Sequence, residues 1–126
     1  MNRSCLLATA LLCLSAVQSH AQDVANGEKA FKKCMACHAI GEGAANKVGP
    51  VLNNVIGRKA GTLEGYSYSQ GMTGAGAAGL IWDEETLTVY LADPRKTVKG
   101  TKMTFGGIKK PEEVTDLIAY LKTFSQ

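Results

Sequence analysis

The chain has 126 residues, 45% of them hydrophobic, which is enough for one small domain and too few for two. Its 14 Lys and Arg residues only slightly outnumber its 11 Asp and Glu residues, and so small an excess does not indicate nucleic-acid binding. The sequence shows no repeat, no low-complexity tract and no sustained strand pattern, so we expect an all-α domain with long loops.

The first 21 residues have the pattern of a secretory signal peptide. Arg3 gives a positive start, residues 5–17 form an almost unbroken apolar run, and small residues lead up to Ala21. We therefore expect cleavage after Ala21, which leaves residues 22–126 as a periplasmic domain. The apolar run is short for a membrane span, so a retained anchor is the less favoured interpretation.

The first expected helix covers residues 23–33, with Asp23 as its cap. Small and apolar positions recur on one side of it at helical spacing. They are Val24, Gly27, Ala30 and Phe31.

A Cys-x-x-Cys-His motif follows at residues 34–38, and after cleavage it holds all of the remaining cysteine and histidine. This motif is typical of c-type haem attachment. The thiols of Cys34 and Cys37 add to two vinyl groups on one side of the porphyrin, and His38 then lies beneath the iron as a ligand.

Three other interpretations of the cysteine pair are weaker. A thioredoxin-like redox pair belongs in a βαβ setting, which the sequence does not show. A zinc site needs four ligands, and the mature chain has neither a second cysteine pair nor another histidine. A disulfide between Cys34 and Cys37 is uncommon at this spacing.

Residues 41–50 are expected to form a loop, and residues 57–79, which are rich in glycine, are expected to be mostly loop. So long an irregular stretch needs something to pack against, and a buried cofactor would meet that need.

Two more helices are expected at residues 83–92 and 111–124. Asp83 is a suitable cap for the first, and Pro111 suits the first position of the second. Three short helices bury little apolar surface, so we expect the protein without haem to be largely unfolded.

The second axial position of the iron is open to several groups. Because no second histidine survives cleavage, the candidates are a methionine or a small exogenous ligand. Met35 lies inside the attachment turn and cannot reach the opposite face of the haem. Met72 and Met103 remain, and spacing favours Met103, although packing is the commoner role of any methionine.

Taken together, these residues resemble the class I cytochromes c, the group that spans mitochondrial cytochrome c and the bacterial cytochromes c2. The resemblance runs along nearly all of the mature chain. It is carried by Gly27, Phe31, the motif at 34–38, Gly49-Pro50, Gly57-Arg58-Lys59, Gly65-Tyr66-Ser67-Tyr68, Trp82, Tyr90-Leu91-Ala92-Asp93-Pro94, Gly100-Thr101-Lys102-Met103 and residues 116–121.

The resemblance implies one covalently bound haem c and a role for each matching residue. Cys34 and Cys37 would carry the thioether bonds, and His38 and Met103 would be the axial ligands. The carbonyl of Pro50 would accept a hydrogen bond from His38 and fix its ring.

Further roles follow from the same resemblance. Tyr68 and Trp82 would hydrogen-bond a haem propionate, with Arg58 balancing its charge. Tyr90 would lie near the sulfur of Met103. Gly27 would let the first helix cross closely over the last one.

The resemblance also implies the function of a monomeric, non-enzymatic electron carrier. Its donor would be a bc1-type complex and its acceptor a terminal oxidase or a photosynthetic reaction centre. A haem enzyme of the peroxidase kind, a gas-binding protein and a redox-responsive assembly protein are the competing functions. A basic face around the haem edge would steer the carrier toward acidic partners. Its members are Lys32, Lys33, Lys47, Arg95, Lys96, Lys99, Lys102, Lys109 and Lys110.

The sequence departs from the mitochondrial pattern in two places. Residues 70–79 are longer and richer in Gly and Ala, which leaves the lower part of the haem site undefined. Arg95 and Thr97 stand where mitochondrial forms usually have a lysine and an aromatic residue, and Pro111 stands where they have a lysine, so partner preference is expected to differ.

Overall fold

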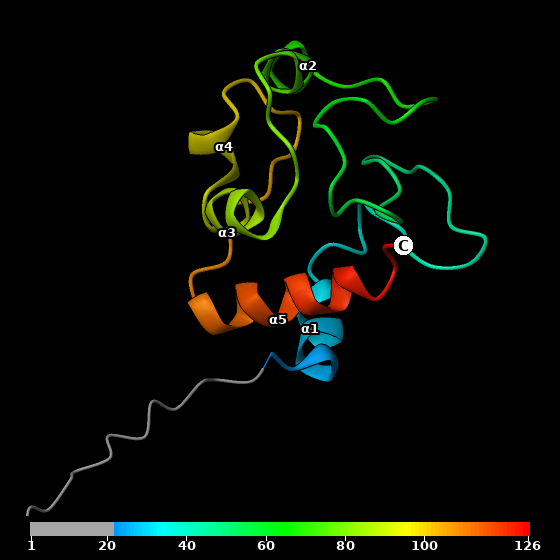
Figure 1. The fold of residues 1–126 in the computed structure, drawn as a ribbon, viewed down its shortest axis with the longest axis vertical. Coiled ribbons are helices and arrows are strands. Elements are labelled where there is room, and N and C mark those ends of the chain that lie inside the picture. Colours follow the sequence, from blue (N-terminus) through cyan, green and yellow to red (C-terminus); the bar gives the residue numbers. More distant parts are fainter. Residues whose placement is uncertain (1–21) are drawn as a thin grey trace, which may run out of the picture.

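The computed structural model describes residues 22–126, so the expected signal peptide lies outside the described residues. Five helices joined by long loops make up this part of the chain (Figure 1). They are α1 (Val24–Phe31), α2 (Gln70–Ala77), α3 (Glu84–Ala92), α4 (Pro94–Thr97) and α5 (Pro111–Lys122). Within residues 22–126 the β pairing is limited to one isolated bridge between Lys59 and Ile81, which confirms the all-α class.

No helix in the described part of the chain combines the length and the apolar character that a membrane crossing requires.

Helices α1 and α5 cross with their backbones almost in contact (Figure 1). A Cβ atom on Gly27 would lie 2.0 Å from the carbonyl oxygen of Asp116, so only glycine fits at this crossing. Beside it the rings of Phe31 and Tyr120 pack with centroids 5.5 Å apart. Val24, expected on the buried side of α1, is instead 44% exposed. Val24 is the first residue of the helix.

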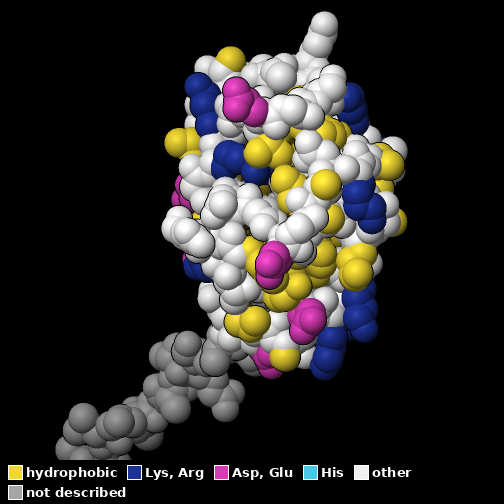
Figure 2. All heavy atoms as spheres, turned by 90° about the vertical axis from the view of Figure 1, so that its right-hand side faces the viewer, with side chains coloured by type: hydrophobic (Ala, Val, Ile, Leu, Met, Phe, Trp, Pro, Cys, Tyr) yellow, Lys and Arg dark blue, Asp and Glu magenta, His cyan; other side chains and the backbone are white. Residues whose placement is uncertain are grey.

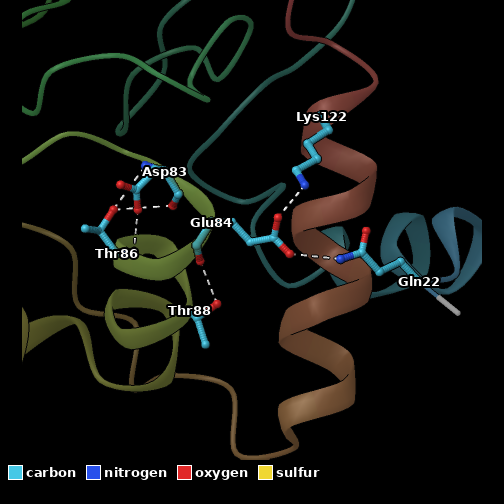
Figure 3. A network of polar contacts seen from close by, with 6 residues as sticks. All are labelled: Gln22, Asp83, Glu84, Thr86, Thr88 and Lys122. Carbon is cyan, nitrogen blue, oxygen red and sulfur yellow. Dashed lines mark hydrogen bonds and ion pairs between the residues drawn. The ribbon is translucent and has the colours of Figure 1, made fainter. Parts of the chain in front are cut away.

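The start of α3 is fixed by hydrogen bonds and tied to α5 (Figure 3). The Asp83 carboxylate accepts a bond of 2.8 Å from the Thr86 amide, and the Thr86 hydroxyl pairs with the Asp83 amide in return. Glu84 accepts bonds from Lys122 of α5 at 2.5 Å and from Gln22 at 2.9 Å. One carboxylate thus links three separate segments of the chain.

The expectation of a loop is wrong for residues 70–77, which form α2. Ser69 caps this helix by accepting a hydrogen bond of 3.1 Å from the amide of Met72. The short helix α4 was also not expected. Pro94 lies just beyond the end of α3 and is also the first residue of α4.

The core lies where α5 meets α1, α3 and the segment that follows α4. Leu117 and Ile118 are 1% and 0% exposed, and Val98 and Val114 are buried beside them. Among the described residues no charged side chain is buried in this core. The apolar packing around α5 therefore supports the loops that enclose the site.

Candidate functional site

A partly open cavity of about 390 Å³ lies at the centre of the molecule. The segments that line it come from both sides of the ribbon in Figure 1: the turn after α1 and the loops before α2 on one side, α3 and the segment before α5 on the other. All nine residues that were expected at the site line this cavity. They are Cys34, Cys37, His38, Pro50, Arg58, Tyr68, Trp82, Tyr90 and Met103.

The cysteine motif continues the end of α1 as a tight turn. The amide of Cys34 donates to the Phe31 carbonyl at 2.8 Å, and the amides of Cys37 and His38 both donate to the Cys34 carbonyl at 3.1 and 2.9 Å. This turn brings both thiols to the cavity, and both are free. The two sulfurs are therefore positioned by a hydrogen-bonded turn that follows α1 directly, with no intervening loop.

Burial raises the pKa of the Cys34 thiol to about 11, although the nearby charge of Lys33 acts in the opposite direction. At neutral pH this sulfur is thus a protonated thiol. Zinc binds the thiolate, and in the described residues no group of three or more His, Cys, Asp and Glu is arranged to hold a metal ion.

His38 is held as a neutral imidazole. Its Nδ1 lies 2.7 Å from the carbonyl oxygen of Pro50, and because a carbonyl only accepts, Nδ1 carries the proton and donates. Burial lowers the pKa of His38; the bond to Pro50 acts against this, and the charges of Lys47 and Arg58 lower it further. Nε2 is then left with a free lone pair, the form in which imidazole binds a metal.

The loop before Pro50 fits closely around His38, a feature that the sequence analysis did not identify. A Cβ on Gly49 would lie 2.4 Å from the Cε1 atom of His38, and the Gly49 amide donates to the Cys37 carbonyl at 2.7 Å. Lys47 donates from Nζ to the carbonyl of Met35 at 2.6 Å. Apart from the approach of Gly49 to the His38 ring, these contacts go to backbone atoms, so residue type alone gave little signal for them.

The sulfur of Met103 also faces a polar group. The Tyr90 hydroxyl donates toward it at an oxygen–sulfur distance of 3.8 Å, and the Met103 amide donates to the Thr101 hydroxyl at 3.2 Å. Burial raises the pKa of Tyr90, against the effect of a hydrogen bond with Thr101, so the phenol is a neutral donor at pH 7. Of the other two candidate methionines, Met72 lines the cavity and Met35 is 54% exposed.

The polar part of the cavity wall contains the guanidinium of Arg58 and several aromatic groups, and Lys33 and Lys102 also line the cavity. Arg58 reaches the carbonyls of Val51 and Asn53 at 3.4 Å. Burial lowers the pKa of this guanidinium, which still stays charged at neutral pH. The rings of Tyr66 and Tyr68 meet edge to face with centroids 4.7 Å apart. This wall can accept a carboxylate through the positive charge of Arg58 and the hydroxyl of Tyr68.

The donor set of the cavity fits a haem. Two thiols on one turn, a neutral imidazole and a thioether line a cavity whose remaining wall is mainly apolar, with one guanidinium. Thiols suit the vinyl groups, imidazole and thioether suit the iron, and the guanidinium suits a propionate.

Comparison with known proteins identifies relatives along almost the whole described chain. The Cytochrome c family matches residues 24–125. Cytochrome c2 of Blastochloris viridis is 48% identical over 115 residues, which are 91% of this chain and 88% of the relative. Cytochrome c2 of Agrobacterium tumefaciens (strain II Chrys) is 58% identical over 99 residues, 79% of this chain and 89% of the relative. The solved structure of cytochrome c2 from Rhodospirillum centenum superposes with a TM-score of 0.77 at 45% identity, covering 82% of this chain and 99% of that one.

Proposed function

The chain belongs to the cytochrome c family of electron carriers with a covalently bound haem c, and on this premise we propose that it shuttles single electrons in the periplasm with His38 and Met103 as the axial ligands of the iron. The observation that carries the proposal is the meeting of these two side chains in one cavity, together with both thiols of the attachment motif.

The bound haem would supply an iron that alternates between Fe(II) and Fe(III). The protein's own residues hold it and set its preference. Cys34 and Cys37 anchor it through thioether bonds. The Pro50 carbonyl accepts a hydrogen bond from Nδ1 of His38 and so keeps Nε2 of the ring directed into the cavity.

On the other side Met103 would fill the sixth position. A thioether donates weakly and favours Fe(II), as does an apolar cavity wall, and both raise the reduction potential. With that position filled there is no place for a substrate to bind, which supports a carrier rather than a peroxidase or a gas-binding protein.

An absorption spectrum of the oxidised protein tests this assignment. We expect a six-coordinate low-spin spectrum with the weak long-wavelength charge-transfer band of methionine bound to Fe(III) haem, and we expect Met103→Ala to lose that band. A high-spin spectrum of the wild type would overturn the carrier proposal in favour of an enzyme or a gas-binding protein. Retention of the band in Met103→Ala with its loss in Met72→Ala would move the ligand to Met72.

We propose that this carrier is a monomer. Its proposed donor is a bc1-type complex, and its proposed acceptor is a terminal oxidase or a photosynthetic reaction centre. Surface charge supports an acidic partner. Figure 2 shows Lys and Arg side chains along both edges of one face, with hydrophobic side chains and a few carboxylates between them. One of the expected docking residues, Lys33, forms an ion pair with Glu113 of α5, so its charge is partly neutralised.

A further inference from the structure

Helix α2 contains three glycines in eight residues, although glycine is a weak helix former. Two of them have a steric reason. A Cβ on Gly71 would lie 2.0 Å from the carbonyl oxygen of Lys99, and one on Gly76 would lie 1.8 Å from that of Ala60. Gly74 has no such steric reason, because a Cβ there would meet nothing within 4 Å. The helix is therefore pressed backbone to backbone against two other segments.

The segment on one side of α2 leads directly to Met103. Gly71 contacts Lys99 and Gly100, and Lys102 donates from Nζ to the carbonyl of Ser67, just before α2. Between these two attachments the Thr101 hydroxyl accepts the amide of Met103. The residues that precede Met103 are thus fixed at both ends to residues 67–71.

The segment on the other side of α2 belongs to the buried interior. Ala60 is 1% exposed, and its amide donates to the Leu80 carbonyl at 2.9 Å. Gly61 has a positive φ of 71°, and a Cβ there would lie 2.9 Å from the carbonyl oxygen of Met72. Because Ala60 is buried and residues 60–61 closely approach the α2 backbone, they oppose movement of α2 toward them.

From these contacts we infer that α2 is a brace for the Met103 segment and that Gly71 is a positioning residue for Met103. This inference rests on the proposed ligation by Met103. A side chain at position 71 would push Lys99 and Gly100 outward and strain the attachment of the thioether to the iron. Exogenous ligands that compete with Met103 would then bind more easily.

Imidazole binding to the purified Fe(III) holoprotein measures this competition, because imidazole must displace the sixth ligand. We expect Gly71→Ala to bind imidazole at least about tenfold more tightly than wild type, equivalent to about 1.4 kcal/mol. The matched variant Gly74→Ala, in the same helix but facing open space, should stay within about twofold of wild type. Equal affinities for the two variants would overturn the brace.

The test separates the brace from the ligand assignment on which it rests. If Met103→Ala binds imidazole no more tightly than wild type, Met103 is not the ligand and both proposals are wrong. If Met103→Ala binds it more tightly while Gly71→Ala matches Gly74→Ala, only the brace is wrong.

Hydrogen exchange on the wild-type protein tests the brace even if Gly71→Ala does not fold. Coupling is reciprocal, so displacing Met103 should loosen α2 as well. With saturating imidazole we expect faster exchange of the amides of Thr73 in α2 and of Ala78 at its C-terminal cap, which donate to the carbonyls of Ser69 and Gly74. Exchange in α1 should be unchanged. Unchanged protection in α2 would contradict the inference.

Discussion

The hydroxyl of Tyr90 lies 3.8 Å from the sulfur of Met103 and shows how one side chain can adjust a redox site. With Met103 as the proposed ligand, a donor at its sulfur would withdraw electron density and disfavour Fe(III) more than Fe(II). The packing of the Trp82 ring against Tyr90, with centroids 4.6 Å apart, holds the phenol in place. Removing the hydroxyl alone should therefore alter the potential without altering the fold.

We predict that Tyr90→Phe lowers the reduction potential by roughly 20–60 mV, since a net hydrogen bond contributes about 0.5–1.5 kcal/mol and 59 mV corresponds to a tenfold change for one electron. Spectroelectrochemical titration measures the shift. Tyr66→Phe is the control, because its hydroxyl donates to the Val48 carbonyl and not to the sulfur. An unchanged or raised potential in Tyr90→Phe would show that the hydroxyl does not act on Met103.

At this scale the sequence predicted which side chains line the cavity and the contact of Pro50 with His38, but it assigned Lys47 and Gly49 no role at the attachment turn. Cys34, Cys37 and His38 form a contiguous motif, and their contact with the cavity could be expected from it. Lys47 and Gly49 act on backbone atoms of the attachment turn. Every residue has a carbonyl, so a contact to a carbonyl depends on the path of the chain and cannot be predicted from the types of the two residues.

Between elements, the crossing of α1 and α5 depends on the missing side chain of Gly27. We predict that Gly27→Ala destabilises the protein by about 2 kcal/mol or more, because its Cβ would lie 2.0 Å from the Asp116 carbonyl oxygen and force the helices apart. Denaturant unfolding of the holoprotein measures this change. The control is again Gly74→Ala, which should be neutral or stabilising by about 0.5 kcal/mol. Similar losses in both variants would refute the close-crossing explanation.

The link between α3 and α5 should depend on pH. The hydrogen bond from Lys122 holds the pKa of Glu84 below its ordinary value of 4.5. A carboxyl group whose pKa is lowered by folding stabilises the protein above its unfolded pKa and stops doing so as pH falls through the folded value. The stabilisation from Glu84 is therefore complete at pH 7 and disappears below pH 4.5.

We predict that Glu84→Gln loses about 0.5 kcal/mol of stability at pH 7 and low salt, as an exposed ion pair allows, and that the loss vanishes at acidic pH. Thermal unfolding across pH measures it. Glu85→Gln removes the same charge from the same helix end but, within residues 22–126, no ion pair. Equal losses in the two variants would assign the effect to the helix dipole and not to Lys122.

The elements that sequence predicted best are those with their own local signals. Residues 83–92 and 111–124 have caps, a proline or an apolar face, and helices α3 and α5 occupy these ranges almost entirely. Helix α2 has no such face and three glycines, and its conformation depends on contacts with Lys99 and Ala60 that are distant in sequence. Tertiary packing outweighs local propensity there.

For the whole molecule the central cavity dominates stability. At about 24 cal/mol per Å³, a cavity of 390 Å³ would cost at most about 9 kcal/mol if it had to be maintained without haem, and domains of this kind have only about 5–15 kcal/mol in total. We predict that the chain produced without haem attachment shows weak far-UV circular dichroism and no cooperative thermal transition. A sharp transition in the haem-free chain would contradict this prediction.

The surface charge should be visible in reactions with small redox reagents of opposite sign. Steering by the basic face predicts that the oxidation rate with ferricyanide, an anion, falls steeply as ionic strength rises, since the Debye length shrinks from about 10 Å at 0.1 M to about 3 Å at 1 M. With a cationic cobalt(III) complex the rate should rise or stay flat. Stopped-flow measurements give both, and identical salt dependences would exclude steering by the protein's charge.

The arrangement of the cavity walls along the chain also has a consequence in time. The attachment turn is complete at His38, whereas Met103 follows 65 residues later and α5 later still. In a chain exported with its N-terminus first, as proposed here, the turn becomes accessible before Met103 does. During that interval the Met103 segment and α5 cannot yet cover the two thiols. An enzyme that joins haem to the turn therefore has access to both. Attachment can therefore precede folding, and the later segments then fold around a haem that is already in place.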